Sequence, residues 1–195
     1  MNSIQPFILA SSSPRRQQLL ADVGFNFEVI HLDIDETYPS NISQPQKVVE
    51  YIAHKKIRGC TDWLARKLVL TADTLVYLGN EIMGKPQHKE EAHVMLNKLA
   101  NTNHTVTTSV CIGFQHRLHQ FSVSTKVYFA ALSNEQITYY VDNYLPLDKA
   151  GGYGIQEWIG HIGICRIEGS YSNVVGLPIH ETYKAIISCS RRWLH

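Results

Sequence analysis

Residues 7–16 read FILASSSPRR, and this stretch decides how the first unit of the fold is built. Four apolar residues predict a short buried strand, and Ser13 followed by Pro14 is typical of a helix N-cap and first helical position. Such a helix start offers unpaired N–H groups and the positive end of a dipole, to which Arg15 and Arg16 add guanidinium forks. The stretch therefore predicts a phosphate cradle, although a capped surface helix with two solvated arginines explains it equally well.

Outward from this stretch, helical and strand patterns alternate along the chain, which predicts an α/β fold. Helices are expected at residues 14–23, 45–59, 88–99, 133–144 and 178–188. Strands are expected at residues 25–29, 68–72 and 75–77, within 166–175, and in a hairpin formed by 105–114 and 121–131. Ser43 with Gln46, and Ser133 with Gln136, have the spacing of a capping box. No linker-like stretch divides the chain, so we expect residues 1–195 to form a single two-lobed domain.

The composition excludes several classes of protein. The chain has 195 residues, a formal net charge of +1 and 44% hydrophobic residues, so no global charge attracts nucleic acid or a membrane surface. Four cysteines lie far apart without a C-x-x-C pair, which favours reduced thiols. No apolar run is long enough to span a membrane, and the first residues do not resemble a signal peptide. We expect a cytoplasmic protein without a stable nucleic-acid partner, and the sequence leaves a homodimer open.

Two charged residues fall within otherwise apolar patterns. Asp73 ends the apolar run of residues 68–72, and a carboxylate at the end of a buried strand must be paired, hydrogen-bonded or bound to metal. An aspartate that caps a turn is the alternative. Lys56 falls in the middle of the apolar side of the helix at 45–59, whereas Lys55 falls at its edge. A core-facing lysine either snorkels or meets an anion, so Lys56 is the favoured cleft lysine, with Lys55 as the alternative.

Two glycine-containing stretches are candidate ligand-binding loops. Residues 79–86, GNEIMGKP, have P-loop spacing, but Pro86 stands where a P-loop needs a hydroxyl and a backbone N–H, so a P-loop is excluded. Lys85 can still reach a phosphate as a point charge. Residues 147–156, LDKAGGYGIQ, allow close approach of the backbone to a ligand, yet a tight connection between elements explains them as well. Zinc spacing and a G-x-S-x-G motif are both absent from the sequence.

Taken together and in this order, these stretches resemble the Maf family of nucleotide pyrophosphatases. The resemblance runs from about residue 8 to residue 187. The matching pieces are SPRR at 13–16, Glu36, Ala53 with Lys56, ADT at 72–74, GKP at 84–86, DKAG at 148–151, YGIQ at 153–156, GSY at 169–171 and NVVGLP at 173–178.

The resemblance implies an α/β fold with a long twisted mixed β-sheet flanked by helices and a central cleft, related to the inosine triphosphate pyrophosphatases. It implies hydrolysis of a nucleoside triphosphate to the monophosphate and pyrophosphate with Mg²⁺ or Mn²⁺. By position, it assigns the general base to Asp73, metal binding to Glu36 and Asp73, phosphate binding to Ser13, Arg16, Lys56 and Lys85, and substrate specificity to Arg15, Thr74 and Gln156.

The form Gly-Ile-Gln at residues 154–156 resembles the subgroup that acts on dTTP and UTP, and a glutamine amide can both donate to and accept from a pyrimidine edge. Glu157 departs from the family pattern, which has glycine there. Two alternatives stay open: a pyrophosphatase for modified purine nucleotides such as 7-methyl-GTP, and a non-enzymatic nucleotide-binding regulator of cell division. Either enzyme requires Arg16, Glu36, Asp73 and Lys85 to line one groove.

Overall fold

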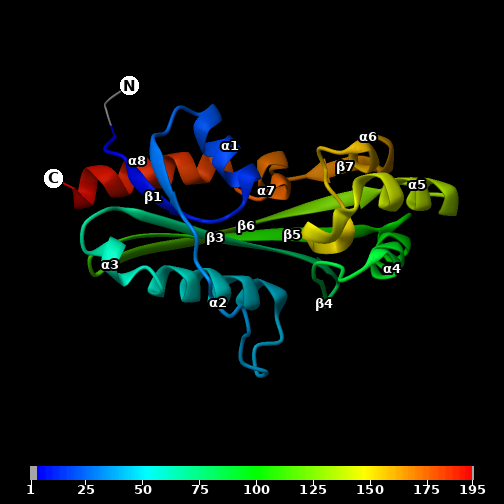
Figure 1. Ribbon diagram of the computed structural model, residues 1–195, viewed down its shortest axis with the longest axis horizontal. Coiled ribbons are helices and arrows are strands. Elements are labelled where there is room, and N and C mark those ends of the chain that lie inside the picture. Colours follow the sequence, from blue (N-terminus) through cyan, green and yellow to red (C-terminus); the bar gives the residue numbers. More distant parts are fainter. Residues whose placement is uncertain (1–3, 195) are drawn as a thin grey trace.

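A mixed β-sheet with helices on both faces organises the computed structural model, which describes residues 4–194 (Figure 1). The strand order within these residues is β2-β1-β3-β5-β6-β7, and β4 pairs with β3. The strands are β1 Phe7–Ala10, β2 Phe27–Ile30, β3 Val69–Leu78, β4 Glu81–Met83, β5 Asn103–Phe114, β6 Arg117–Phe129 and β7 Ile164–Glu168. The predicted mixed sheet flanked by helices is confirmed.

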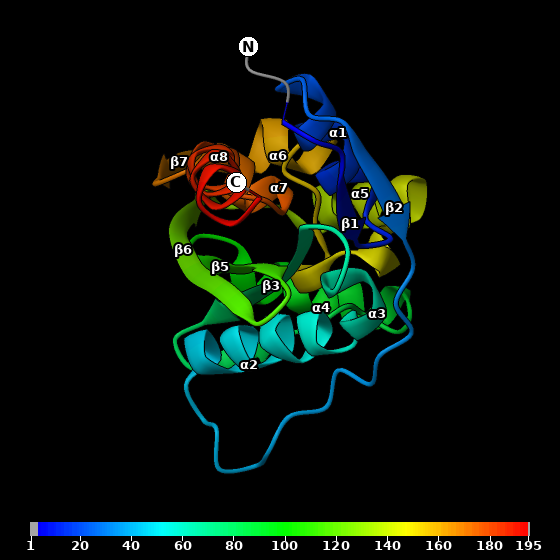
Figure 2. The same ribbon diagram turned by 90° about the vertical axis from the view of Figure 1, so that its left-hand side faces the viewer.

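The helices divide between the two faces of the sheet and one end of it. Helix α2 lies on one face, whereas α1, α7 and α8 lie on the other (Figures 1 and 2). The helices are α1 Pro14–Asp22, α2 Pro45–Arg58, α3 Thr61–Leu64, α4 Lys89–Leu99, α5 Asn134–Tyr144, α6 Trp158–Gly163, α7 Tyr171–Val175 and α8 Ile179–Trp193, with 3₁₀ turns η1 Pro146–Asp148 and η2 Ala150–Gly152. Among residues 4–194, no helix has both the length and the hydrophobicity needed to cross a bilayer.

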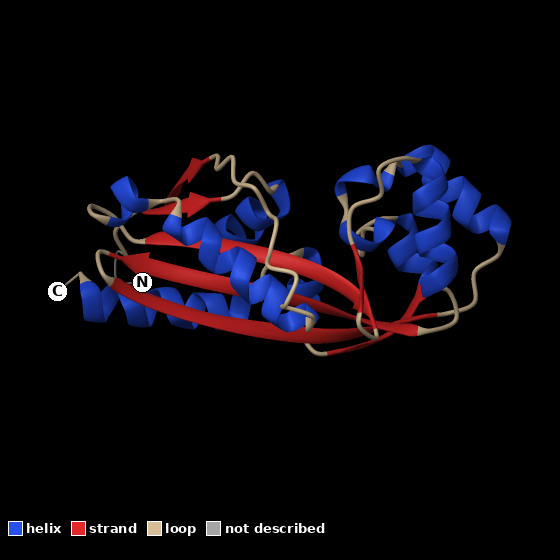
Figure 3. Cartoon of the chain, turned by 90° about the horizontal axis from the view of Figure 1, so that it is seen from below, coloured by secondary structure: helices blue, strands red, loops and turns tan. Residues whose placement is uncertain are grey.

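The long central strands contribute to two separate hydrophobic clusters. Leu70 of β3 and Ile112 of β5 belong to the cluster near α8, whereas Val76 and Val106 of the same strands belong to the cluster near α4 and α5. Figure 3 shows the corresponding arrangement: the strands extend from a half that contains most of the sheet toward a half that is mostly helical. The same strands thus connect both halves.

The predicted hairpin is confirmed and is longer than expected. Strands β5 and β6 pair from Asn103 opposite Tyr128 to Phe114 opposite Arg117, with Gln115 at a positive φ of 53° in the turn. Strand β5 is buried along most of its length because helices cover both of its faces, and its buried residues include polar ones such as Thr107, Thr108 and Ser109. The polar residues at the start of β6 do not predict a strand from their sequence pattern, because this part of β6 is held in the sheet by main-chain pairing with β5.

Two expectations about local structure were wrong. Strand β3 is continuous through Asp73 and Thr74, which pair with Ser109 and Thr108 of β5, so the carboxylate lies within the strand and not at its end. The backbone ladder is made by every residue regardless of side chain, which explains why a polar pair does not end the strand.

The second wrong expectation concerns the start of α2. Gln44, not Ser43, is the N-cap residue of α2, and it makes no side-chain capping hydrogen bond. Pro45 occupies the first helical position, where its fixed φ suits a helix start without a capping side chain. The capping box of Ser133 and Gln136 at the start of α5 is confirmed.

The pairing of β3 leaves one of its edges open along a short stretch. Strand β1 pairs with β3 only at residues 69 and 70, and β4 joins β3 from Val76 onward. Strand β5 occupies the other side throughout. Within the described residues, therefore, residues 71–75 of β3 carry a neighbouring strand on one side only. We call this stretch the open edge of β3, and it is where helix termini and loops reach the sheet.

Candidate active site

Helix α1 begins beside the open edge of β3, and it starts with the N-cap and first helical residue that the sequence predicts. The Ser13 hydroxyl caps the helix by accepting from the backbone N–H of Arg16 at 3.4 Å, and Pro14 is the first helical residue. The Ser11 hydroxyl accepts from the Ser13 backbone N–H at 3.2 Å. This serine turn after β1 fixes the direction in which α1 points its first turn, including Arg16.

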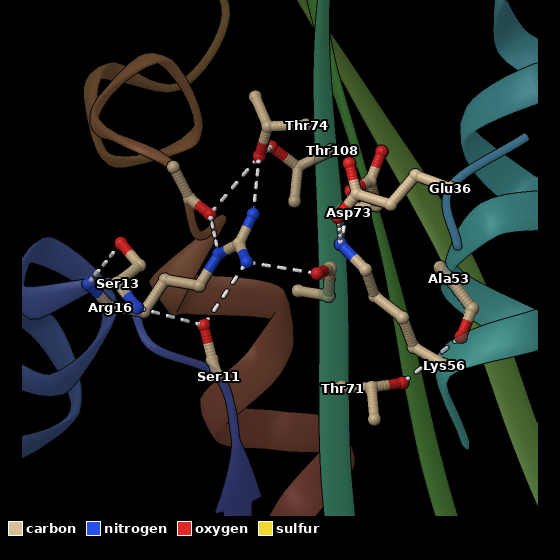
Figure 4. A network of polar contacts seen from close by, with 12 residues as sticks. Ser11, Ser13, Arg16, Glu36, Ala53, Lys56, Thr71, Asp73, Thr74 and Thr108 are labelled. Atoms are coloured by element: carbon tan, nitrogen blue, oxygen red, sulfur yellow. Dashed lines mark hydrogen bonds and ion pairs between the residues drawn. The ribbon is translucent and has the colours of Figure 1, made fainter. Parts of the chain in front are cut away.

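The Arg16 guanidinium reaches across to the open edge of β3 (Figure 4). Its nitrogens donate to the Ala72 carbonyl at 2.9 Å, to the Thr74 hydroxyl at 3.0 Å and to the Ser11 hydroxyl at 3.2 Å. The Gly176 carbonyl, at the end of α7, accepts from Nε at 2.9 Å. Arginine has five N–H donors. Four are therefore engaged within the chain, so Arg16 offers a ligand its charge and one remaining N–H.

A second charged group occupies the other side of β3. Lys56 Nζ lies 2.6 Å from Asp73 Oδ1 and 2.8 Å from Glu36 Oε1, and the exposed fractions of the Lys56 and Asp73 side chains are only 14% and 9%. Lys56 comes from α2, Asp73 from β3 and Glu36 from the loop between β2 and α2 (Figure 4). We call these three residues the Lys56 cluster. They bring two carboxylates onto one ammonium group.

Helix geometry explains why Lys56 and not Lys55 enters this cluster. The Thr71 hydroxyl of β3 donates to the Ala53 carbonyl of α2 at 3.1 Å, which fixes this face of the helix against the strand. Lys56 lies three residues after Ala53, on the same side of the helix. Lys55 points toward the surface, where its ammonium lies 3.4 Å from Asp35. The preference for Lys56 as the inward lysine agrees with this geometry.

Alternation along β3 separates the Lys56 cluster from Arg16. Successive side chains of a strand point to opposite faces, so Asp73 faces α2 while Thr74 faces α1. The Thr74 hydroxyl is already in contact with Arg16 and with the Thr108 hydroxyl at 2.9 Å. The structure therefore places Glu36 and Asp73 together and puts Arg16 across the strand from them. The two groups can act on one ligand only around the open edge of β3.

The charges near the open edge act on one another. Burial alone raises the pKa of Glu36, but hydrogen bonding and attraction from Lys56, with smaller effects of Lys85 and Arg16, hold that pKa below its usual value. Burial lowers the pKa of Arg16, whereas Asp73 raises it. Lys85 is exposed in the turn that follows β4. Glu36 therefore lies within range of the charges of Lys56, Lys85 and Arg16.

The glycine-rich stretch packs against the turn that carries Lys85. The Gly151 N–H donates to the Gly84 carbonyl at 2.9 Å. Gly151 has a φ of +74°, and a Cβ there would lie 3.0 Å from Val76 Cγ1 of β3. A residue with a side chain would therefore be strained by its backbone and crowded by the strand. The stretch therefore forms a tight connection, as one of the two interpretations predicts, and Gly151 lies against Val76 of β3. A role in ligand binding stays a prediction.

Two residues predicted to set substrate specificity, Arg15 and Gln156, lie in the outer part of this region. Arg15 Nη1 lies 3.3 Å from Asp148 Oδ2, which links the first turn of α1 to η1. Gln156 is exposed in the turn before α6. Their assignment to substrate specificity remains a prediction.

Several residues that support the site were not identified from the sequence. The buried Asn173 amide donates to the Val106 carbonyl at 3.0 Å and to the Thr125 hydroxyl at 2.9 Å, which holds α7 on the sheet. This anchor fixes the Gly176 carbonyl that receives Arg16. Beside Gln156, the Glu157 carboxylate contacts both the Tyr140 hydroxyl and the Lys149 ammonium. Only the departure at Glu157 from the family pattern could have drawn attention to that group.

The carboxylates of the Lys56 cluster fit the ligand preferences of a divalent cation. Glu36 and Asp73 already converge on a single positive group. The described residues contain no cluster of three or more His, Cys, Asp or Glu side chains suited to a metal. Mg²⁺ is often held by only one or two carboxylates, with water and substrate phosphates completing its shell. Glu36 and Asp73 are therefore the residues that would hold such an ion together with a phosphate.

Two cavities lie away from these residues. One, of about 560 Å³, is lined by residues at the start of β6 and by residues of α8, among them Arg117, His119 and Trp193. The other, of about 600 Å³, is lined by residues before and within α2, among them Lys47 and Tyr51. Neither includes a member of the Lys56 cluster, so the expected central cleft remains a prediction.

Comparison with known proteins gives consistent matches. A family model described as Maf-like protein matches residues 6–189. The chain is 46% identical over 182 residues to a protein of Flavobacterium psychrophilum named dTTP/UTP pyrophosphatase, covering 93% of both chains. It is 46% identical to a protein of the same name from Parabacteroides distasonis, covering 92% of this chain and 93% of the relative.

Solved structures with a detectable likeness are more distant. The Ham1 protein of Staphylococcus aureus is 17% identical with a TM-score of 0.49, covering 94% of this chain and 98% of that one. A nucleoside-triphosphatase, dITP/XTP pyrophosphatase, of Mycobacterium abscessus is 10% identical with a TM-score of 0.42, covering 66% and 74%.

Proposed function

Because the chain belongs to the Maf family, we propose that it hydrolyses dTTP and UTP to the nucleoside monophosphate and pyrophosphate. The relatives that carry this name match more than nine-tenths of the chain, so the comparison concerns the whole domain. The observation that carries the proposal is the Lys56 cluster, in which a buried strand carboxylate at an open sheet edge meets an amine and a second carboxylate.

Asp73 is the general base in this proposal. Its carboxylate is held by Lys56 at 2.6 Å, and its backbone is fixed by pairing with β5, so its orientation does not depend on a flexible loop. A base fixed in this way can accept the proton of a water that attacks the α-phosphorus. General base catalysis contributes roughly 10²–10⁴-fold to a rate. Lys56 lies close enough to stabilise negative charge on a phosphoryl oxygen beside that water.

The triphosphate would be held by cationic and hydroxyl groups around the open edge. Lys85 is exposed on a short Gly-Lys-Pro turn and can bind the outer phosphates as a point charge. Arg16 contributes its fixed charge and its one uncommitted N–H. Ser13 lies at the start of α1, where the helix dipole favours an anion. Together these groups oppose the charge that develops on the leaving pyrophosphate.

Glu36 and Asp73 would hold a divalent metal, Mg²⁺ or Mn²⁺, in this proposal. When bound, such an ion neutralises phosphate charge and polarises the phosphoryl group. Glu36 keeps its negative charge well below neutral pH because cationic neighbours lower its pKa. The nucleobase would be read by Gln156, whose amide can both donate and accept, with Arg15 and Thr74 setting the position of the neighbouring chain.

A substrate panel tests the proposal. Purified protein at fixed Mg²⁺ is given dTTP, UTP, CTP, the purine triphosphates and 7-methyl-GTP, and pyrophosphate release is measured. We expect dTTP and UTP to have the highest kcat/KM. A preference for 7-methyl-GTP would instead support the purine alternative, and binding without pyrophosphate release would support the non-enzymatic regulator.

Paired variants connect that activity to the site. Glu36→Gln removes a carboxylate of the Lys56 cluster, whereas Asp35→Asn changes the adjacent carboxylate that pairs with surface Lys55. We expect a strong loss of activity from the first variant and near wild-type activity from the second. Equal activity of the two would separate the reaction from the Lys56 cluster.

A further inference from the structure

Gln156 lies in a tight turn whose two ends are both fixed. The Glu157 N–H donates to the Gly154 carbonyl at 3.1 Å, which closes a four-residue turn with Gln156 in third place. Ile155, the residue before it, is only 7% exposed and belongs to the hydrophobic cluster near α4 and α5. The turn thus anchors one side chain in the core and presents the next, Gln156, to solvent.

The carboxylate of Glu157 folds back onto this same turn. It accepts from the Tyr140 hydroxyl and lies 3.0 Å from Lys149 Nζ. The Tyr140 hydroxyl in turn accepts from the Gly154 N–H at 2.9 Å. Gly154, Tyr140 and Glu157 therefore form a closed ring of hydrogen bonds around the residue that precedes Gln156. Tyr140 is fully buried, so this ring is attached to the rigid interior of α5.

Two glycines show how closely the turn is packed. A Cβ on Gly154 would lie 2.6 Å from Glu157 Cδ and 2.8 Å from its Oε2, so only glycine leaves room for the carboxylate. A Cβ on Gly160 of α6 would lie 2.1 Å from the Ile155 carbonyl oxygen. The Glu157 carboxylate therefore packs closely against Gly154, and the first turn of α6 packs closely against Ile155. The position of Glu157 is a specific feature of this packing.

The ring continues as a chain of ion pairs toward α1. Lys149, whose side chain is largely buried, lies 2.6 Å from Asp148 Oδ1 as well as against Glu157. Asp148 then pairs with Arg15 at the start of α1. The same carboxylate that holds the turn of Gln156 is therefore connected to the helix start beside the open edge of β3.

We propose that Glu157 is a positioning residue that fixes the turn carrying Gln156 and thereby sets how strictly the protein discriminates among nucleobases. Glu157 does not contact substrate in this inference. It acts through the backbone of Gly154 and through the side chains of Tyr140 and Lys149. The expected effect on nucleobase discrimination rests on the proposed function, whereas the expected ordering of the turn by Glu157 is independent of it.

Burial, reinforced by the Glu157 carboxylate, raises the pKa of Tyr140, so the tyrosine remains a protonated donor at any ordinary pH. A glutamine at position 157 keeps an oxygen that can accept this hydrogen bond, whereas an alanine keeps none. Glu157→Gln therefore keeps the acceptor for Tyr140 but removes the negative charge that pairs with Lys149, whereas Glu157→Ala removes both. Glu168→Ala is a matched control, because Glu168 also accepts from a tyrosine, Tyr128, but on the exposed β6–β7 pair.

The first readout is discrimination between UTP and CTP, which differ at the base edge. We expect Glu157→Ala to reduce the ratio of their kcat/KM values by at least about fivefold, chiefly through KM for UTP, because a misplacement of 1 Å can cost on the order of 10²-fold. Glu157→Gln and Glu168→Ala should retain most of the ratio. In a Gln156→Ala background, Glu157→Ala should change the ratio no further. A general loss of stability would instead lower kcat/KM for UTP and CTP equally and leave the ratio unchanged in both backgrounds.

The second readout is amide hydrogen exchange of Gly154, whose N–H donates to the Tyr140 hydroxyl, and it needs no substrate. We expect exchange there to be at least about tenfold faster in Glu157→Ala than in wild type, as local opening becomes easier, and nearly unchanged in Glu168→Ala. If wild type releases no pyrophosphate from any triphosphate, the proposed function fails, and exchange alone decides the positioning role. Unchanged exchange overturns the inference. For an active enzyme, an equal loss of kcat/KM on UTP and CTP also overturns it.

Discussion

Replacing Lys56 with methionine tests whether the buried ion pair is as tight as its geometry indicates. Methionine keeps an unbranched side chain of similar reach but removes the ammonium that lies 2.6 Å from Asp73 and 2.8 Å from Glu36. The exposed fraction of the Asp73 side chain is only 9%, so water cannot readily replace the lost partner. The variant leaves an uncompensated carboxylate beside β3.

The expected loss of stability follows from that burial. Breaking a buried ion pair by removing one partner costs roughly 3–5 kcal/mol in the free energy of unfolding. Glu36 has more access to water than Asp73, and Asp73 can take up a proton, so we expect a value near the lower limit, about 3 kcal/mol. Lys55→Met is the matched control. It breaks a surface pair with Asp35, and such pairs are worth at most about 1 kcal/mol.

Urea unfolding of wild type, Lys56→Met and Lys55→Met measures both losses, and the single variant Asp73→Asn is measured with them. A third variant, Lys56→Met with Asp73→Asn, removes the buried charge together with its partner and should recover much of the stability, because the carboxylate that remains, Glu36, is 57% exposed and can be solvated. The reasoning is refuted if Lys56→Met costs no more than Lys55→Met, or if the double variant is as unstable as the sum of the two single changes.

Two further predictions concern groups outside the site. Burial lowers the pKa of His104, which is 1% exposed, from 6.5 to about 4. The unfolded chain therefore binds a proton at a higher pH than the folded one, and stability should fall by roughly 3 kcal/mol as pH drops from 6.5 to 4. His104→Gln should lack this component in pH-dependent urea unfolding; an unchanged slope would contradict the burial. Cys165 is exposed, whereas burial raises the pKa of Cys60 and Cys189 to about 11 and of Cys111 to about 12. Titration of the native protein with a disulfide reagent should therefore show one fast-reacting thiol, and this thiol should be absent in Cys165→Ser. Three fast-reacting thiols would contradict the burial of the other cysteines.

Local patterns were sufficient to predict several parts of the site. The start of α1 was predicted because Ser13 and Pro14 act through hydrogen bonds and dihedral angles within one turn. The orientation of Lys56 followed from helical periodicity, which depends only on its spacing from the apolar side of α2. These features are set within a few residues, so a single sequence contains the information.

Features that depend on distant pairing could not be predicted in the same way. The open edge of β3 exists because β1 stops pairing at residue 70 and β4 starts at Val76, which is a matter of register between strands. The engagement of Arg16 by Ala72 and Gly176 joins three elements that no periodicity relates. The contact of Tyr140 with Glu157 likewise connects two helices across a loop.

The most direct test of the account is the rate of pyrophosphate release from dTTP by Asp73→Asn, compared with wild type at the same Mg²⁺ concentration. Asparagine can still accept the hydrogen bond of Lys56 but cannot take a proton from water. We predict that kcat falls by at least about 100-fold while urea unfolding shows a folded protein. A folded variant that keeps more than about a hundredth of the wild-type kcat would contradict the assignment of Asp73 as the base.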